Sequence, residues 1–265
     1  MSSTPTRAGL RRGLARGAVL LLISLLALQL YFLLRVALMV WVNPDSTTFQ
    51  RSEIWRLLID KQQVAWSRQW VPYDRIAATL KRAVIAAEDA GFAEHSGIEW
   101  EAIEKAWERK QQAQARADQT HQRREESAAR RGGAAAPFAT VAPRLVGGST
   151  ITQQLAKNLF LGSERSLARK AQEIVIVWML EAVLDKRRIF EIYLNNVEWG
   201  EGVFGAEAAA QHYFRRSAAA LSAQQAAQLA VMLPAPKRFE KRPGSAYVMG
   251  RAATIAARMP GVHVP

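Results

Sequence analysis

Two adjacent acidic residues, Glu88 and Asp89, are the first candidates for chemistry in this chain. They follow a run of small and apolar residues that predicts a helix, which Gly91 would end. On a helical wheel Glu88 lies on the apolar stripe of that helix, whereas Asp89 points away from the centre of the stripe. Burial and the negative end of the helix would both raise the pKa of Glu88, as a general base requires. Taken alone, the doublet is more typical of a solvated surface.

A second polar segment begins at Gly147-Gly148 and continues through Ser149. Flexible glycines followed by a hydroxyl side chain predict the start of a helix. Four polar residues of this helix share one narrow sector of the wheel: Thr150, Gln154, Lys157 and Asn158. A helix N-terminus with a lysine on the same side can hold a phosphate group. The alternative is an amphipathic helix that is well capped and binds no ligand.

A third polar segment contains Arg169, Lys170 and Glu173, and the residues from 174 to 180 that follow it are apolar. A helix that is apolar on every side is buried, so Glu173 must be paired or protonated. Arg169, one turn earlier, is the expected partner. A purely structural salt bridge would also account for this segment.

The composition limits the kinds of molecule that this protein is expected to bind. The chain has 265 residues, with 36 Lys and Arg against 23 Asp and Glu, and a formal net charge of +13. Such a charge favours a membrane surface or a substrate that carries a pyrophosphate. Nucleic acid is the other usual partner of a basic protein, but no recognisable binding motif supports it. The absence of cysteine excludes disulfides and thiolate metal sites.

Residues 18–42 are long and apolar enough to cross a hydrocarbon layer of about 30 Å. Arginines at positions 7, 11, 12 and 16 precede this run, so the positive-inside rule places the basic N-terminus, residues 1–17, in the cytoplasm. A cleaved signal peptide is the alternative. The apolar run is longer than a signal peptide needs, and no small-x-small cleavage site follows it.

The remainder of the chain predicts a mostly helical domain over residues 72–240, because no segment shows a convincing period of two. Helices are expected at residues 73–90, 151–161, 169–186, 187–194 and 222–233, and from residue 100 into the region 104–131. Residues 43–71 form a juxtamembrane segment rich in Trp and Arg, which either lies at the membrane interface or packs as an ordinary amphipathic segment. Residues 104–140 have too few apolar side chains for a core and are predicted to be a solvated insertion, helical or disordered. A basic arm that contacts anionic lipid is the alternative. Residues 241–265 are predicted to be a short C-terminal tail.

The three polar segments and two further ones resemble, in order, the five motifs of the family 51 glycosyltransferases, which polymerise peptidoglycan strands from lipid II. The resemblance runs from about residue 73 to residue 236. The matching stretches are Glu88-Asp89-Ala90-Gly91-Phe92-Ala93-Glu94-His95-Ser96-Gly97, Gly147-Gly148-Ser149-Thr150-Ile151-Thr152-Gln153-Gln154 with Lys157-Asn158, Arg169-Lys170-Ala171-Gln172-Glu173, residues 186–195 and residues 229–234. The resemblance implies an all-α, lysozyme-like glycosyltransferase domain preceded by a single transmembrane helix.

The same resemblance implies roles for individual residues. Glu88 would be the general base and Glu173 a second catalytic carboxylate. Lys157, Arg169 and Lys170 would bind pyrophosphate. The other expected substrate-binding residues are Asp89, Phe92, His95, Ser149, Thr150, Gln154, Asn158 and Asn195, and Arg188 is expected near the site. A divalent cation, Mg²⁺ or Mn²⁺, could help these residues to hold the charge of the donor phosphates. No organic cofactor is expected.

The reaction that the resemblance implies is the polymerisation of lipid II into β-1,4-linked glycan strands, with release of undecaprenyl pyrophosphate. The sequence contains neither Ser-x-x-Lys nor Lys-Thr-Gly, the signatures of a penicillin-binding transpeptidase. The expected location is the bacterial inner membrane with the catalytic domain in the periplasm, and cell-division or elongation proteins are candidate partners. Two alternatives remain: a lytic, lysozyme-like enzyme that cleaves glycan, and a non-catalytic, membrane-anchored cell-wall scaffold.

Overall fold

The computed structural model describes residues 7–101, 149–162, 164 and 166–265, together with positions 104, 108, 111, 112 and 119. Apart from these five positions, the predicted insertion at residues 104–140 lies outside the described residues, and so do Gly147 and Gly148. The α-helices of the described part are α1 (Arg7–Leu38), α2 (Thr48–Lys61), α3 (Ala78–Glu88), α5 (Ile151–Phe160), α6 (Leu167–Val183), α7 (Lys186–Asn196), α8 (Ala206–Phe214), α9 (Ala223–Met232), α10 (Pro236–Phe239) and α11 (Ala246–Arg258). Short 3-10 turns are η1 (Tyr73–Arg75), η2 (Ala218–Ala220) and η3 (Met259–Gly261), and the strands are β1 (Ser67–Arg68), β2 (Glu198–Gly200) and β3 (Val203–Phe204).

Most predicted helices are present, and the differences occur at their ends. The helix expected from residue 73 is instead the short turn η1 followed by α3, because Ile76 and Ala77 are extended. The backbone N–H of Ala77 donates to Ala218 O at 3.0 Å, which draws this segment out of the helix. The helix predicted from residue 169 starts slightly earlier and ends at Val183. Asp185 then caps α7 by accepting from the backbone N–H of Arg188.

A small sheet was not predicted. Its strand order is β1-β3-β2, with β1 parallel to β3 and β2 antiparallel to it. Strands of two or three residues are too short to show a period of two. The sheet joins the juxtamembrane segment to the domain, since Ser67 N donates to Gly202 O at 2.8 Å. Gly202 has φ +73, and a Cβ there would lie 2.0 Å from Ala65 O, so this close approach requires glycine.

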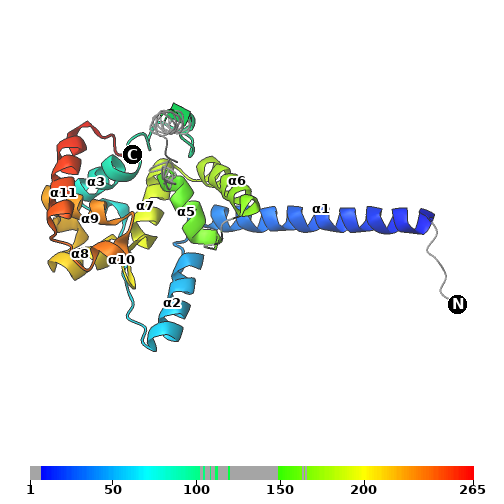
Figure 1. Ribbon diagram of the computed structural model, residues 1–265, viewed down its shortest axis with the longest axis horizontal. Coiled ribbons are helices and arrows are strands. Elements are labelled where there is room, and N and C mark those ends of the chain that lie inside the picture. The colour runs from blue at the N-terminus through cyan, green and yellow to red at the C-terminus, as the bar shows by residue number, and fades with distance from the viewer. Residues whose placement is uncertain are drawn as a thin grey trace, which may run out of the picture.

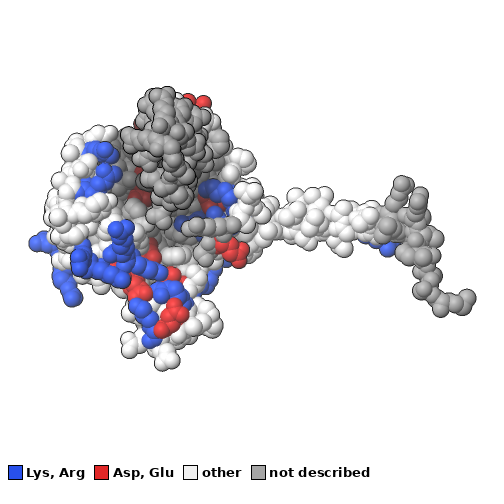
Figure 2. Space-filling view, in the orientation of Figure 1, with Lys and Arg blue, Asp and Glu red and all other residues white. Residues whose placement is uncertain are grey.

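The first helix has two parts with different surroundings. Its first half projects from the helical body (Figure 1). Its second half packs against the body: Phe32, Val36 and the following Met39 are buried, and Phe32 contacts the ring of Phe160 at 5.4 Å between centroids. The run Gly13–Leu38 is long and apolar enough to cross a membrane. Among residues 13–28 of the projecting part, Arg16 is the charged residue, and most of the described surface there is uncharged (Figure 2).

The C-terminal residues are part of the domain, which corrects the prediction of a tail at residues 241–265. Helix α11 packs against α9 and α3 and contributes Val248, Ala252 and Ile255 to the core. The C-terminus lies beside α3 in Figure 1. These positions follow a helical period in the sequence, so the period was a signal that the prediction overlooked.

Candidate active site

Glu88, the proposed base, is the last residue of α3 and is half-buried. Its Oε2 accepts a hydrogen bond of 2.8 Å from the side-chain amide of Gln154 on α5. Burial raises the pKa of Glu88 above the ordinary value, the Gln154 bond lowers it, and the charge of Asp89 raises it again. The predicted direction of the pKa shift therefore agrees with the structure.

Asp89 differs from its predicted place. The helix ends at Glu88, and Asp89 has φ −164 and ψ 77, so the helical wheel no longer applies to it. Its carboxylate is 1% exposed and accepts two hydrogen bonds, from His95 Nε2 at 2.8 Å and from the backbone N–H of Ile151 at 2.9 Å. Asp89 thus connects the end of α3 to the first turn of α5, where a carboxylate is favoured by the helix dipole. It is a structural neighbour of the base and not a substrate contact.

His95 and Thr150 complete this connection. The Nδ1 of His95 accepts from the backbone N–H of Gly97 at 3.1 Å, so the ring proton is assigned to Nε2, which donates to Asp89. Thr150 caps α5 by accepting from Gln153 N, and its hydroxyl donates to Gly97 O at 2.6 Å. Both side chains therefore hold the loop after α3 against the start of α5.

The predicted cations gather around Glu173. Arg169 Nη1 lies 2.8 Å from Glu173 Oε2, and Lys170 Nζ is paired with Glu173 Oε1. The expected salt bridge of Arg169 is confirmed, and Glu173 has a second cationic partner as well. Lys157 lies on α5, which packs against α6, and the charges of Glu173, Arg169 and Lys170 all act on its ammonium group.

Lys157 is the cation of this group that has no carboxylate within salt-bridge distance among the described residues. Its side chain reaches the surface, yet the protein around it desolvates the ammonium group and lowers its pKa. The charge of Glu173 opposes this shift, and the charges of Arg169 and Lys170 add to it. An anion bound at Lys157 would relieve both the desolvation and the repulsion.

The base and the cations lie along one helix. Gln154, which contacts Glu88, is three residues before Lys157 on α5, and residues three apart are neighbours on a helix surface. The axial rise between them is about 4.5 Å. The proposed base is therefore joined through Gln154 to the helix that carries Lys157, and this helix packs against α6, which carries Arg169 and Lys170.

Two predicted substrate contacts are structural instead. Phe92 is fully buried and packs against Phe190 at 5.4 Å between centroids, so a substrate does not reach it. Asn195 is also fully buried: its Oδ1 accepts from Val71 N, and its Nδ2 donates to Val71 O and Glu191 O. Asn195 therefore joins the juxtamembrane segment to α7 by pairing with the backbone.

Ser149 and Asn158 remain available to a ligand. Ser149 is exposed, and its backbone carbonyl receives a long contact of 3.4 Å from Gln154 Nε2. Asn158 is half-buried, and its side chain forms no hydrogen bond with the part of the chain that the structure describes. Their roles in substrate binding stay predictions.

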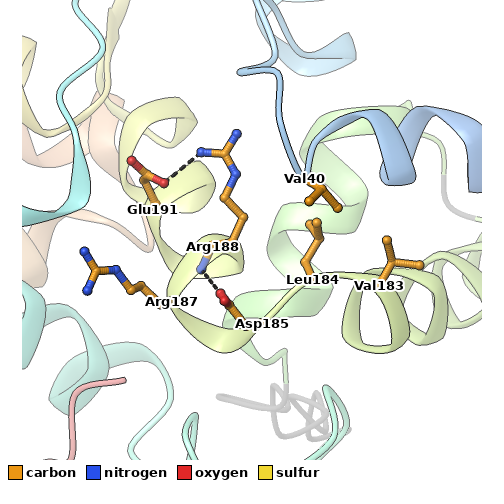
Figure 3. Close-up of a pocket in the computed structure, with 7 residues that line it drawn as sticks. All are labelled: Val40, Val183, Leu184, Asp185, Arg187, Arg188 and Glu191. Atoms are coloured by element: carbon orange, nitrogen blue, oxygen red, sulfur yellow. Dashed lines mark hydrogen bonds and ion pairs between the residues drawn. The ribbon is translucent and has the colours of Figure 1, made fainter.

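Arg188 lies away from this site, beside the end of α1. Its guanidinium donates to Met39 O at 2.8 Å and to Glu191 at 2.7 Å, and it also contacts Val42 O and Asn43. A cavity of about 260 Å³ lies here, with Val40, Val183 and Leu184 facing charged side chains of α7 (Figure 3). Arg188 therefore holds the segment that follows α1 against α7, and its hydrogen bonds in the described structure are with this segment and with Glu191.

A second layer of residues, not predicted from the sequence, lies behind the site. The hydroxyl of Tyr193 on α7 donates to Gln154 Oε1 at 3.0 Å. Glu181 on α6 accepts from the Thr152 hydroxyl at 2.6 Å and pairs with Lys186 at 2.9 Å. Lys186 also donates to His95 O at 2.6 Å. Tyr193 and Lys186 lie within the fourth motif stretch, which was the available signal.

The described residues do not provide a cation site. They contain no group of three or more His, Cys, Asp or Glu side chains that could hold a metal ion. Both oxygens of Glu173 are already paired with Arg169 and Lys170. The optional Mg²⁺ or Mn²⁺ therefore stays a prediction, and no step is assigned to it.

Comparison with known proteins identifies the family of this chain. A sequence model of the family described as Transglycosylase matches residues 57–119 and 129–260. The chain belongs to the transglycosylase family. The all-α, lysozyme-like fold and the N-terminal apolar helix expected of such a transglycosylase are confirmed, with the small sheet as an addition.

Relatives in this transglycosylase family share nearly half of their residues with the chain. The biosynthetic peptidoglycan transglycosylase of Burkholderia vietnamiensis is 49% identical over 240 residues, covering 91% of this chain and 86% of the relative. The protein of the same name from Paraburkholderia phytofirmans is 46% identical over an alignment of 266 residues that covers 99% of each chain. The one from Paraburkholderia xenovorans is 46% identical over 243 residues, covering 92% of this chain and 90% of the relative.

Proposed function

We propose that this protein is a membrane-anchored peptidoglycan glycosyltransferase that polymerises lipid II into β-1,4-linked glycan strands and releases undecaprenyl pyrophosphate. One observation carries the proposal. Glu88 is hydrogen-bonded to Gln154, Gln154 is a neighbour of Lys157 on the surface of α5, and α5 packs against α6, which carries Arg169 and Lys170. The names of the relatives, biosynthetic peptidoglycan transglycosylase, support the same activity.

Glu88 acts as the general base. As the 4-hydroxyl oxygen of the acceptor GlcNAc attacks the anomeric carbon of the donor MurNAc, Glu88 takes the hydroxyl proton. The new C1–O4 bond forms while the bond from C1 to the phosphate oxygen breaks, and the electron pair of that bond leaves with the diphosphate. A single displacement of this kind converts an α-linked phosphate into a β-1,4 bond.

The cations stabilise the leaving group. Negative charge develops on the bridging oxygen as the diphosphate departs, and fixed positive charges at that place lower the barrier. Lys157 is suited to direct contact because it has no carboxylate partner among the described residues. Glu173 orients Arg169 and Lys170 by pairing with both of them. This is the role that we assign to the second carboxylate.

The anchor keeps the enzyme beside its lipid-linked substrates. Helix α1 packs against α6, and the side chains of Gln29 and Gln172 exchange hydrogen bonds of 2.8 and 3.0 Å. Glu173 follows Gln172 directly, so the helix that carries the cations is fixed to the anchor. The basic N-terminus then lies in the cytoplasm and the catalytic domain in the periplasm, at the surface of the inner membrane.

Exposed apolar residues of α6 also support a position at the membrane. Leu167 is 91% exposed and Trp178 is 55% exposed, and both belong to the helix that lies beside α1. A lipid surface would cover such residues, and tryptophan is typical of the interface. Lipid II, the lipid-linked glycan strand and the membrane are the partners of this proposal, and cell-division or elongation proteins remain candidates.

The direct test is polymerisation by the purified full-length protein in detergent. Wild type, Glu88→Gln and Glu94→Gln are incubated with lipid II, and the glycan products are separated by gel electrophoresis. Glu94 is an exposed carboxylate on the loop that follows the base, which makes it a matched control. We expect Glu88→Gln to lose roughly 10²- to 10⁴-fold in rate and Glu94→Gln to keep the wild-type rate.

Two results would reject the proposal. Polymer formation by Glu88→Gln at the wild-type rate would show that Glu88 is not the general base. Shortening of purified sacculi without polymerisation of lipid II would favour the lytic enzyme. A scaffold without catalysis predicts that Glu88→Gln keeps its cellular function.

A further inference from the structure

Gln154 is the residue that holds the carboxylate of Glu88. Among the described residues, the bond of 2.8 Å from Gln154 Nε2 is the side-chain hydrogen bond that Glu88 accepts. This bond stabilises the ionised form and lowers the pKa of Glu88 against the effect of burial. The position and the charge of the base therefore depend on how the Gln154 amide is held.

The two ends of an amide have opposite hydrogen-bonding character, because the nitrogen only donates and the oxygen only accepts. The nitrogen of Gln154 faces two acceptors, Glu88 Oε2 and the Ser149 carbonyl. Its oxygen faces the hydroxyl of Tyr193 at 3.0 Å. Tyr193 is thus the donor that satisfies the other end of the amide in the described structure.

Tyr193 is well suited to be a permanent donor. Its side chain is almost completely buried, and its pKa is raised well above the ordinary value, first by burial and then by the charges of Glu88 and Asp89. The phenol consequently keeps its proton over the range in which the enzyme would work. Stacking on Phe190, at 6.3 Å between centroids, holds the ring in place without the hydroxyl.

Donation to the amide oxygen also strengthens the bond at the amide nitrogen, because hydrogen bonds in a chain polarise one another. Without the hydroxyl, the amide oxygen would lose its partner inside the protein, and the amide would turn more freely. Both effects weaken the bond to ionised Glu88. A weaker bond raises the pKa of the base and leaves it less well oriented.

We propose that Tyr193 is a positioning residue for the reaction, which acts through the Gln154 amide to hold Glu88 ionised and in place. The inference rests on the proposed function of Glu88 as the general base. In this proposal α7 supplies a buried residue that is connected, through Gln154, to the carboxylate that takes the proton.

The test compares two tyrosines that differ mainly in location. Tyr213, like Tyr193, donates its hydroxyl to an oxygen inside the protein, here Trp199 O at 2.8 Å. Tyr193→Phe and Tyr213→Phe each remove one hydroxyl and keep the ring. The kcat and KM for lipid II are measured with the full chain in detergent over a range of pH.

We expect Tyr193→Phe to lower kcat roughly tenfold near neutral pH and to leave KM for lipid II nearly unchanged. The acidic limb of the rate profile should move to higher pH, so that part of the lost rate returns as the pH rises. Tyr213→Phe should keep the wild-type profile, although it loses a comparable internal hydrogen bond.

A double-mutant cycle separates positioning from a general loss of stability. Gln154→Leu removes the amide, and Tyr193→Phe should add little to its effect because the two residues act in series. Additive effects, an unchanged profile in Tyr193→Phe, or an equal loss of rate at every pH would each overturn the inference. If Tyr193→Phe does not fold, Gln154→Leu alone must still shift the acidic limb. Normal polymerisation by Glu88→Gln would instead reject the proposed function.

Discussion

The carboxylate of Asp89 accepts the backbone N–H of Ile151 at 2.9 Å, and this bond ties the end of α3 to the start of α5. Glu88 is the residue just before Asp89, and Lys157 lies two turns further along α5. One buried carboxylate therefore sets the position of the base relative to the cations. The importance of Asp89 follows from this connection and does not require contact with a substrate.

Replacing Asp89 should destabilise the protein and also lower the rate of its reaction. In Asp89→Asn the amide oxygen can still accept from Ile151 N, but the amide nitrogen would face the N–H of His95, where two donors oppose each other. We expect a loss of about 1–3 kcal/mol in the free energy of unfolding. Thermal unfolding in detergent measures it, with exposed Asp74→Asn as the control. Unchanged stability of Asp89→Asn would contradict the structural role.

The rate of polymerisation should depend on the ionisation of Glu88. Burial and Asp89 raise the pKa of Glu88 above the ordinary value of 4.5, and a base works only in its ionised form. Activity should therefore be present above this raised pKa and be lost as the pH falls through it. Initial rates with lipid II across pH, with thermal stability measured in parallel, test this. A rate that stays constant down to the pKa of an ordinary carboxyl group would argue against Glu88 as the base.

Lys157→Ala should weaken donor binding and leave the fold intact. The ammonium group has no carboxylate partner among the described residues, so its removal leaves no buried charge unpaired. A lost contact to a charged group corresponds to about 1.5–3 kcal/mol, or roughly a tenfold to hundredfold loss of kcat/KM for lipid II. Exposed Lys241→Ala is the control. Unfolding of Lys157→Ala would show that the lysine is structural.

Asn195 and Asn158 should respond in opposite ways. Asn195→Ala leaves the backbone groups of Val71 without partners inside the protein, at a cost of about 1–3 kcal/mol each, while KM for lipid II stays constant. Asn158→Ala breaks no hydrogen bond that the structure describes, so stability should be kept and KM should rise. The two variants are compared by thermal unfolding and steady-state kinetics. A raised KM with normal stability in Asn195→Ala would restore its assignment to the substrate.

The sequence alone determined the local features of this protein. The apolar run of α1, the start of α5 with a hydroxyl cap, and the pairing of Arg169 with Glu173 depend on residues that are close along the chain, although the cap proved to be Thr150. Helical periodicity and capping express such short-range interactions directly. The raised pKa of Glu88 also followed from its place on the apolar stripe.

Only the tertiary structure showed which residues of the motif stretches are held by contacts inside the protein. Asp89, Phe92 and Asn195 belong to the motif stretches, yet their partners Ile151, Phe190 and Val71 lie far away in the sequence. The same holds for the hydroxyl of Tyr193, whose partner Gln154 is 39 residues away. A motif shows which residue types occur together, but hydrogen bonds between distant segments arise only when the chain is packed. For that reason candidate reactive residues could be proposed from the sequence, whereas the internal contacts that hold them could not.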